Sequence, residues 1–137
     1  KIRSMPLLLV VAAALVDKTG KVLVQQRAPD RSMAGLWEFP GGKVEPGETP
    51  EVALARELEE ELGVAVVTGD LDPIAFASEA LGERHLLLLL YSVRRWIGEP
   101  RALDASALRW ASVDDLRTLP MPPADVPLVE AMARLIA

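Results

Sequence analysis

The sequence contains no cysteine, one histidine and fewer basic than acidic residues. Without cysteine the protein can form no disulfide scaffold, thiolate metal site or thiol nucleophile, so packing has to stabilise it, and we expect a reducing, cytoplasmic location. The 15 Lys and Arg residues against 20 Asp and Glu give a formal net charge of −5. This charge argues against non-specific binding of duplex DNA, which needs a clustered basic surface. If the partner is a smaller polyanion, cations have to screen the repulsion.

Apolar runs long enough to cross a bilayer are also missing. The run Leu7–Val16 has ten residues, whereas a spanning helix needs about 20. Lys1 and Arg3 before this run match the start of a signal peptide, but no convincing cleavage site with a polar flank follows. We therefore interpret Leu7–Val16 and Leu86–Leu90 as buried strands, and we expect no membrane partner.

The length of 137 residues suits one domain with a sizeable core, which we place at residues 5–137. The chain does not begin with Met, so we expect Lys1–Ser4 to belong in part to an added segment or an upstream leader. No repeat or low-complexity tract interrupts the domain.

Turn and cap residues divide the chain into predicted elements. Lys18-Thr19-Gly20 is a short polar link that predicts a hairpin between strands at 7–17 and 21–27. Thr49 and Pro50 predict a helix start, and Gly63 predicts its end after Leu62. Further elements are predicted as strands at 36–39, 74–78, 85–93 and 108–112, a helical turn at 113–116, a helix at 126–136, and loops at 28–35, 40–42 and 120–123. This order predicts an α/β fold, an α/β/α sandwich with a mixed β-sheet.

Three glutamates on the first predicted helix can carry chemistry. Glu60 and Glu61 follow Glu57 by three and four residues, so their carboxylates share one side of the helix. Such a charge run can be a solvated helix face. Like charges at this spacing destabilise a helix unless a cation lies among them, and oxygen ligands without His or Cys suit Mg²⁺ or Mn²⁺. The glutamates by themselves therefore predict either a solvated face or a site for a hard cation.

A glycine-rich segment upstream supplies the spacing that favours the cation. Five residues separate Gly42 from Glu48, and seven more separate Glu48 from the segment Arg56–Val64. This pattern resembles the complete signature of the Nudix hydrolases. Other segments resemble the MutT-like branch of that family, so that the resemblance covers nearly the whole chain: Gly35–Lys43, Arg84-His85, Trp96, Gly98–Pro100 and Trp110.

The resemblance implies the Nudix fold and a Mg²⁺-dependent enzyme, with Mn²⁺ as an alternative metal. MutT-like members release a nucleoside monophosphate and pyrophosphate from a nucleoside triphosphate. The leading expectation is 8-oxo-dGTP hydrolysis, which cleans the nucleotide pool. The alternative is a CTP or dCTP pyrophosphohydrolase, and a third reading is a nucleotide-binding module without catalysis, which the intact glutamates disfavour. We expect a cytoplasmic monomer or homodimer.

The same resemblance implies the roles of the signature residues. Glu57, Glu60 and Glu61 would be metal ligands together with the Gly41 carbonyl, and Glu57 can double as the base. Arg56 would hold a carboxylate through a bidentate contact. Its expected partner is Glu48, which would orient the ligands.

Two further acidic or basic positions are less determined. MutT-like proteins often carry a glutamate as an extra metal ligand or base where this chain has Asp104. The shorter aspartate either keeps that role with a shifted reach or is a plain loop residue. The single histidine, His85, is expected to be structural rather than a catalytic base.

Substrate binding is expected from five residues around the glycine-rich segment. Gly42 and Lys43 belong to the loop that can face phosphate, Arg27 can reach the base or phosphates or lie on the surface, and Phe39 can stack on a base or fill the core. Asp125 falls at the base-reading position, where well-known dGTP-cleaning members carry asparagine and members similar to CTP pyrophosphohydrolases carry aspartate. It can also cap the last helix. An ionised aspartate only accepts hydrogen bonds, which suits the amino group of cytosine.

Overall fold

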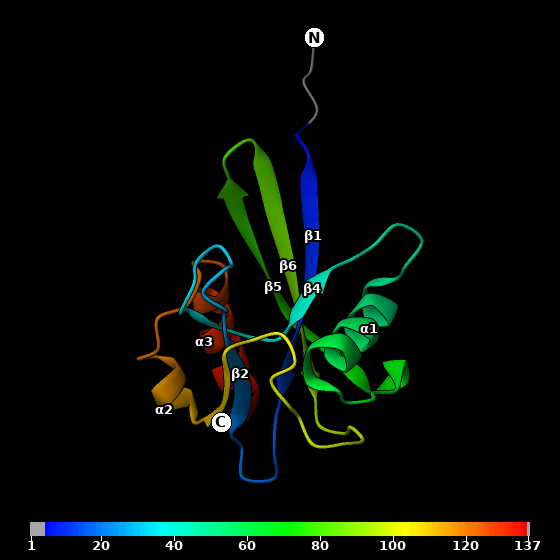
Figure 1. The fold of residues 1–137 in the computed structure, drawn as a ribbon, viewed down its shortest axis with the longest axis vertical. Coiled ribbons are helices and arrows are strands. Elements are labelled where there is room, and N and C mark those ends of the chain that lie inside the picture. The colour runs from blue at the N-terminus through cyan, green and yellow to red at the C-terminus, as the bar shows by residue number, and fades with distance from the viewer. Residues whose placement is uncertain (1–4, 137) are drawn as a thin grey trace.

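The structure is a computed structural model that describes residues 5–136, so Lys1–Ser4 and the last residue of the expected domain lie outside the described residues. The elements, shown in Figure 1, are β1 (Leu7–Leu15), β2 (Val22–Gln26), β3 (Trp37–Glu38), β4 (Gly41–Lys43), α1 (Pro50–Leu62), the 3-10 turn η1 (Thr68–Asp70), β5 (Leu71–Leu81), β6 (Arg84–Val93), β7 (Ala107–Ala111), α2 (Val113–Leu116) and α3 (Asp125–Ile136).

The strands form two sheets. The first has the order β4-β1-β6-β5 and is mixed, because β1 runs parallel to β6 and the other neighbours are antiparallel. The second has the order β3-β2-β7 and is antiparallel. The predicted hairpin between β1 and β2 forms only at its turn, where the Asp17 N–H donates to the Lys21 carbonyl at 2.9 Å and Val16 pairs with Val22; beyond this bridge the two strands join different sheets. The reason is that β6 and β4 already pair with the two edges of β1.

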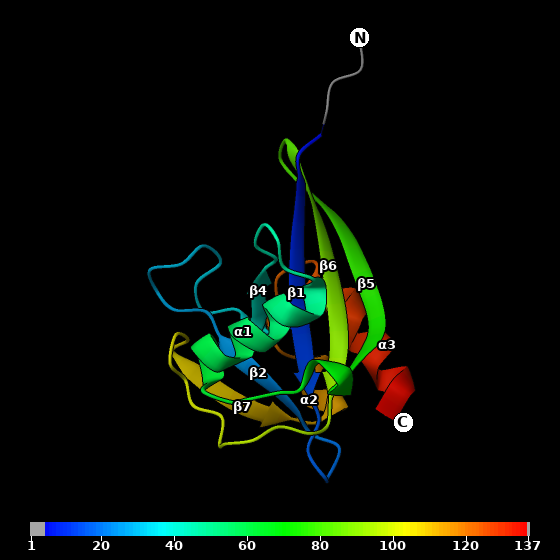
Figure 2. The ribbon, with the colours of Figure 1, turned by 90° about the vertical axis from the view of Figure 1, so that its right-hand side faces the viewer.

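Helices cover both faces of the mixed sheet. Side chains alternate along β1, so Val11, Ala13 and Leu15 face the buried leucines of α1. The intervening residues pack with α3 in a second cluster, which contains Ala12, Ala14, Val16, Leu128 and Met132. Figure 2 shows α1 and α3 on opposite sides of the sheet. The predicted α/β/α sandwich is confirmed.

Helix α1 begins and ends where its caps predict. The Thr49 hydroxyl accepts a hydrogen bond from the Val52 N–H at 3.2 Å, and Gly63 adopts φ +71° after the last helical residue. The stripe of Leu54, Leu58 and Leu62 is fully buried. This stripe fixes the rotation of α1 and turns Glu57 and Glu61 toward the sheet edge.

The glycine-rich segment forms strand β4, whereas the sequence predicted a loop. A Cβ on Gly41 would lie 1.9 Å from the Val11 carbonyl oxygen, so only glycine lets this strand approach β1 so closely. Strand β5 is also longer than the predicted 74–78, because it pairs with β6 over nearly the full length of the hairpin. The first difference comes from pairing with a strand distant in the sequence, and the second from pairing with the next strand of a hairpin.

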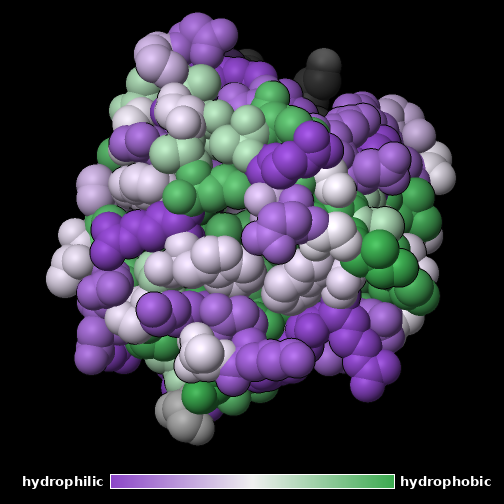
Figure 3. Space-filling view, turned by 60° about the horizontal axis from the view of Figure 1, so that its bottom comes forward, coloured by the Kyte–Doolittle hydropathy of each residue, from purple (hydrophilic) through white to green (hydrophobic). Residues whose placement is uncertain are grey.

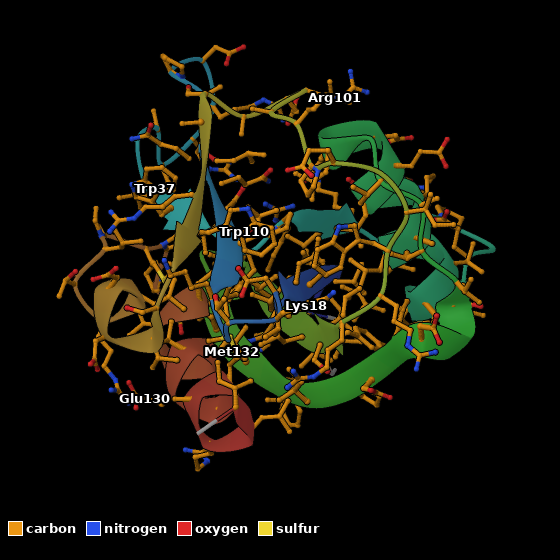
Figure 4. All side chains as sticks on the ribbon, turned by 90° about the horizontal axis from the view of Figure 1, so that it is seen from below. Lys18, Trp37, Arg101, Trp110, Glu130 and Met132 are labelled. Carbon is orange, nitrogen blue, oxygen red and sulfur yellow. The ribbon has the colours of Figure 1, made fainter. Side chains whose placement is uncertain are left out.

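None of the helices within residues 5–136 is long and apolar enough to cross a membrane. On the face in Figure 3, hydrophilic and hydrophobic residues are interspersed. Figure 4 shows Trp110 on β7, and this ring stacks on Trp96 with centroids 5.9 Å apart. The connection from β6 to β7, which carries Arg101, passes the end of α1, where the Arg101 N–H donates to the Leu62 carbonyl at 2.9 Å.

Candidate active site

A cavity of about 880 Å³ lies between the edge of the mixed sheet, α1 and three connections. Acidic side chains outnumber basic ones in its lining. Glu48 and Arg56 do not belong to the lining. The expected site residues that do line it are Arg27, Phe39, Gly41, Gly42, Lys43, Glu57, Glu60, Glu61, Asp104 and Asp125.

Arg56 donates two hydrogen bonds to Glu48. Its Nε donates to Glu48 Oε2 at 2.7 Å, and its Nη2 donates to Glu48 Oε1 at 2.8 Å. This bidentate contact, together with the Glu45 N–H, lowers the pKa of Glu48 to about 2, and it raises the pKa of Arg56 above its usual range. The pair joins the segment after β4 to the middle of α1.

The same guanidinium also holds two of the three signature glutamates. Arg56 Nη1 donates to Glu57 Oε1 at 2.8 Å and to Glu60 Oε2 at 3.3 Å, while Nη2 donates to the Lys43 carbonyl at 3.1 Å. The sequence argument required a positive charge among these like charges. Arg56 supplies such a charge from the same helix.

Glu61 has a different environment from its neighbour Glu60. Glu61 is 8% exposed, and its Oε1 accepts from Gln25 Nε2 at 2.9 Å and from the Gly41 N–H at 3.2 Å. Burial raises the pKa of Glu61 to about 8. The Glu60 side chain is 60% exposed. Glu61 thus points away from Glu60, and within the described part of the chain no three acidic or histidine side chains are arranged to hold a metal.

The donor chemistry around β4 nevertheless fits a hard cation. Backbone bonds join β4 to β1 on either side of Gly41, from Ala13 N–H to Pro40 O at 2.8 Å and from Val44 N–H to Leu9 O at 3.1 Å. Gly41 therefore lies at a non-hydrogen-bonded position of the ladder, and its carbonyl points away from β1. Carboxylate and carbonyl oxygens are the donors that Mg²⁺ prefers.

Gly42 lets the Glu57 carboxylate approach the strand. A Cβ on Gly42 would lie 2.4 Å from Glu57 Cδ. Partial burial raises the pKa of Glu57, although the Arg56 contact opposes this shift. Glycine at position 42 therefore leaves the room that the Glu57 carboxylate occupies.

Asp125 lines the same cavity from the start of the last helix. It is the first residue of α3 and is 6% exposed, and its Oδ2 accepts from the Phe39 N–H at 3.1 Å, so the carboxylate ties α3 to the segment before β4 rather than capping its own helix. Burial raises its pKa to about 7. Phe39 is 3% exposed and packs in the core cluster beside Ala124, which leaves little of its ring free for stacking.

The remaining expected residues lie around the rim. Arg27 Nη1 donates to Glu38 Oε1 at 2.9 Å and its Nε donates to the Ser32 carbonyl at 2.6 Å. Lys43 is exposed at the end of β4. Asp104 forms an ion pair with Arg31 at 2.8 Å.

Residues 6–132 match the family model of the NUDIX domain. The chain belongs to the Nudix family. It is 40% identical over 127 residues to the CTP pyrophosphohydrolase of Escherichia coli (strain K12), with 93% of each chain covered. It is 36% identical over 119 residues to the 8-oxo-dGTP diphosphatase of the same strain, with 87% of this chain and 91% of the relative covered. The solution structure of the E. coli ORF135 protein resembles it with a TM-score of 0.88 and 38% identity, covering 100% of this chain and 96% of that one.

These similarities confirm a MutT-like Nudix hydrolase and its fold. Nudix hydrolases act on nucleotide substrates and generally need a divalent metal. The metal and the roles of individual residues are taken from the sequence signature and from the contacts described above.

Sequence reasoning missed two residues of this Nudix site, Gln25 and Glu38. The Gln25 amide is 3% exposed and donates to Glu61 and, at 3.4 Å, to Glu38 Oε2, while its own Oε1 has no hydrogen-bond partner among residues 5–136. Glu38 in turn accepts from Arg27. The available signal was a glutamine that continues the buried run of β2. His85 contacts Ser78 across the β5–β6 hairpin and is absent from the cavity lining, as a structural histidine would be.

Proposed function

We propose that this protein is a Mg²⁺-dependent nucleoside triphosphate pyrophosphohydrolase, with Mn²⁺ as an alternative metal. The observation that carries the proposal is the set of oxygen donors from Gly41, Glu57, Glu60 and Glu61 at one wall of a nucleotide-sized cavity. The names of the two E. coli relatives, a CTP pyrophosphohydrolase and an 8-oxo-dGTP diphosphatase, support the reaction type. The products are a nucleoside monophosphate and pyrophosphate. Because free nucleotides are found in the cytoplasm, we propose that the reaction takes place there.

Each signature residue has a proposed role around the metal. Glu57, Glu60, Glu61 and the Gly41 carbonyl would hold Mg²⁺, which supplies charge neutralisation on the phosphates and an activated water. Arg56 fixes Glu57 by binding its Oε1, which leaves Oε2 to accept the proton of the attacking water. Glu48 keeps Arg56 in this position through their two hydrogen bonds.

Asp125 and Asp104 complete the proposed assignment. Arg27, Gly42, Lys43 and Phe39 border the nucleotide, and Asp104 lies close enough to the cavity to assist the metal once it leaves Arg31. Asp125 reads the base. Its neutral form can donate to a carbonyl oxygen such as O6 of 8-oxoguanine, and its ionised form accepts from N7–H or from the amino group of cytosine.

The base preference therefore has two candidates. A pKa of about 7 populates both forms of Asp125 near neutral pH. We propose 8-oxo-dGTP as the leading substrate, with hydrolysis that cleans the nucleotide pool. CTP or dCTP is the second candidate, favoured by the ionised carboxylate.

A nucleotide panel tests the proposal. Purified protein with Mg²⁺ should release pyrophosphate rather than phosphate from at least one of 8-oxo-dGTP, dGTP, CTP and dCTP. The variant Glu60→Gln should lose about 100-fold or more in turnover, because a metal contributes several kcal/mol to the transition state. Glu59→Gln, on the neighbouring exposed position of α1, is the matched control and should keep its turnover. Release of phosphate, or an active Glu60→Gln variant, would contradict the assignment.

A further inference from the structure

One ion pair closes the rim of the cavity between two distant loops. Arg31 Nη2 donates to Asp104 Oδ1 at 2.8 Å, although the residues are 73 positions apart in the chain. Arg31 lies in the β2–β3 connection and Asp104 lies in the β6–β7 connection, and both line the cavity. Their side chains are 54% and 46% exposed, so water and ligands reach the pair.

The Asp104 side of this pair lies beside the helix that carries the proposed metal ligands. The Leu103 N–H donates to the Glu61 carbonyl at 3.1 Å, which anchors the next residue, Asp104, beside the last turn of α1. Asp104 in turn holds Arg31 at this side of the cavity. A triphosphate whose phosphates meet the proposed metal would bring them to the same side.

Arg31 is more available to a ligand than Arg27 and Arg56. Arg27 donates to Glu38 and twice to Ser32, and Arg56 lies outside the lining with its fork occupied by carboxylates. For Arg31, the described residues provide one side-chain partner, and that partner is half exposed. An ion pair between such side chains contributes little and is readily exchanged.

We infer that Arg31 is a triphosphate-binding residue that exchanges partners during the reaction. In the free protein it pairs with Asp104. When a nucleotide binds, its guanidinium transfers to the oxygens of the terminal phosphates, whose higher charge and fork-like geometry suit arginine better than one carboxylate does. The exchange frees the Asp104 carboxylate beside the glutamates, where it adds negative charge for the metal.

This inference rests on the proposed function, because it names the part of the triphosphate that Arg31 contacts. It also accounts for a problem of charge. The cavity lining is predominantly acidic, and a triphosphate entering it is repelled unless cations reach its far end. Arg31 provides one such cation from the chain itself.

The variant Arg31→Gln tests the exchange. Its KM for the nucleoside triphosphate should rise about tenfold, as expected for the loss of one charge-assisted hydrogen bond, while kcat changes by less than about threefold. Inhibition by Mg²⁺-pyrophosphate should weaken by about the same factor, and inhibition by the nucleoside monophosphate should not change. Arg109→Gln is the matched control, because Arg109 is equally exposed and pairs with Asp115 at 3.5 Å away from the cavity.

The outcomes separate this inference from the proposed function. Unchanged inhibition by pyrophosphate in Arg31→Gln would overturn the inference, as would an equal loss of monophosphate binding. Arg31→Lys, which keeps the charge without the fork, should recover part of the loss and guards against a folding defect in the glutamine variant. A wild-type protein that hydrolyses no nucleoside triphosphate would instead contradict the proposed function.

Discussion

Two sets of carboxylates lie at and behind the same cavity and differ in their electrostatic environments. The arginine-bound carboxylates are Glu48, Glu57 and Glu60, which share Arg56. The buried carboxylates are Glu61 and Asp125, which accept hydrogen bonds only from neutral N–H groups. The guanidinium lowers the pKa of Glu48 to about 2, whereas burial raises the pKa of Glu61 to about 8 and that of Asp125 to about 7.

The comparison shows that partner and burial together, rather than the type of acid, decide the charge at this site: partial burial raises the pKa of Glu57 although Arg56 opposes this shift. A guanidinium beside a carboxylate favours its ionised form, and removal from water without a counter-charge favours the neutral form. In the arginine-bound set the guanidinium of Arg56 supplies the counter-charge. In the buried set, a proton or an incoming cation would remove the free-energy cost of a buried, unpaired negative charge.

The largest effect is expected from removing the shared cation with Arg56→Met. The arginine-bound carboxylates would repel one another, and Glu57 would lose the contact that holds it. We expect turnover to fall about 100-fold or more, as for loss of a preorganised electrostatic contact. We also expect the melting temperature to fall by several degrees, and Mg²⁺ to raise it more in the variant than in the wild type.

Arg117→Met provides the control for this prediction. Arg117 also makes a bidentate contact, to Glu130 at 2.8 and 2.9 Å, but its side chain is 45% exposed and far from the cavity. It should lower the melting temperature less and leave turnover unchanged. Equal effects of the two variants would show that the arginine-bound set has no special role.

A second prediction displaces a member of the same set without removing charge. In Gly42→Ala, the new methyl group would overlap the Glu57 carboxylate, which has to turn away. We expect turnover to fall about 10- to 100-fold, in the range for disturbed support of a metal ligand. Steady-state kinetics and Mn²⁺ binding followed by electron paramagnetic resonance measure the two effects.

Gly69→Ala is the matched control, because a Cβ at Gly69 would meet no atom within 4 Å. Its kinetics and Mn²⁺ binding should equal those of the wild type. If Gly42→Ala is equally silent, Glu57 does not need its observed position.

Local chemistry made the helix and its glutamates predictable from the sequence. Thr49, Pro50 and Gly63 act on their own neighbours, and the leucine stripe follows the helical period, so α1 begins, ends and faces as expected. The resemblance of the signature then supplied the roles. These inferences needed no knowledge of which strands pair.

The features that sequence reasoning missed depend on contacts between distant segments. Strand β4 forms, and β2 joins the second sheet, because β4 and β6 pair with the two edges of β1. No turn motif in the sequence reveals this pairing. The positive charge among the glutamates was expected from a metal, but Arg56 already provides it. Gln25 belongs to the site because β2, a strand of the second sheet, lies close enough to α1 for the Gln25 amide to donate to Glu61.

The smallest effect is expected from Asp125→Asn, which removes a charge from the buried set. Because the folded pKa of about 7 exceeds the unfolded value of about 3.9, ionisation of Asp125 opposes folding. This opposition is absent at low pH, grows above about pH 4 and is complete above about pH 7. The free energy of unfolding of the variant relative to the wild type should therefore rise by about 2 kcal/mol from pH 5 to pH 8.

Denaturant unfolding across this pH range, with Asp114→Asn as an exposed control, measures that rise. Asparagine can still accept from the Phe39 N–H, so the contact that ties α3 to the rim is retained. The same variant sharpens the comparison at the level of substrate, because a permanently neutral side chain that donates and accepts should shift preference from cytosine nucleotides toward 8-oxo-dGTP. Suppose that the difference in unfolding free energy between variant and wild type does not change with pH, and that the order of substrate preference is unaltered. Ionisation of Asp125 then does not oppose folding, and Asp125 does not contact the base. The buried set would then contain Glu61 alone.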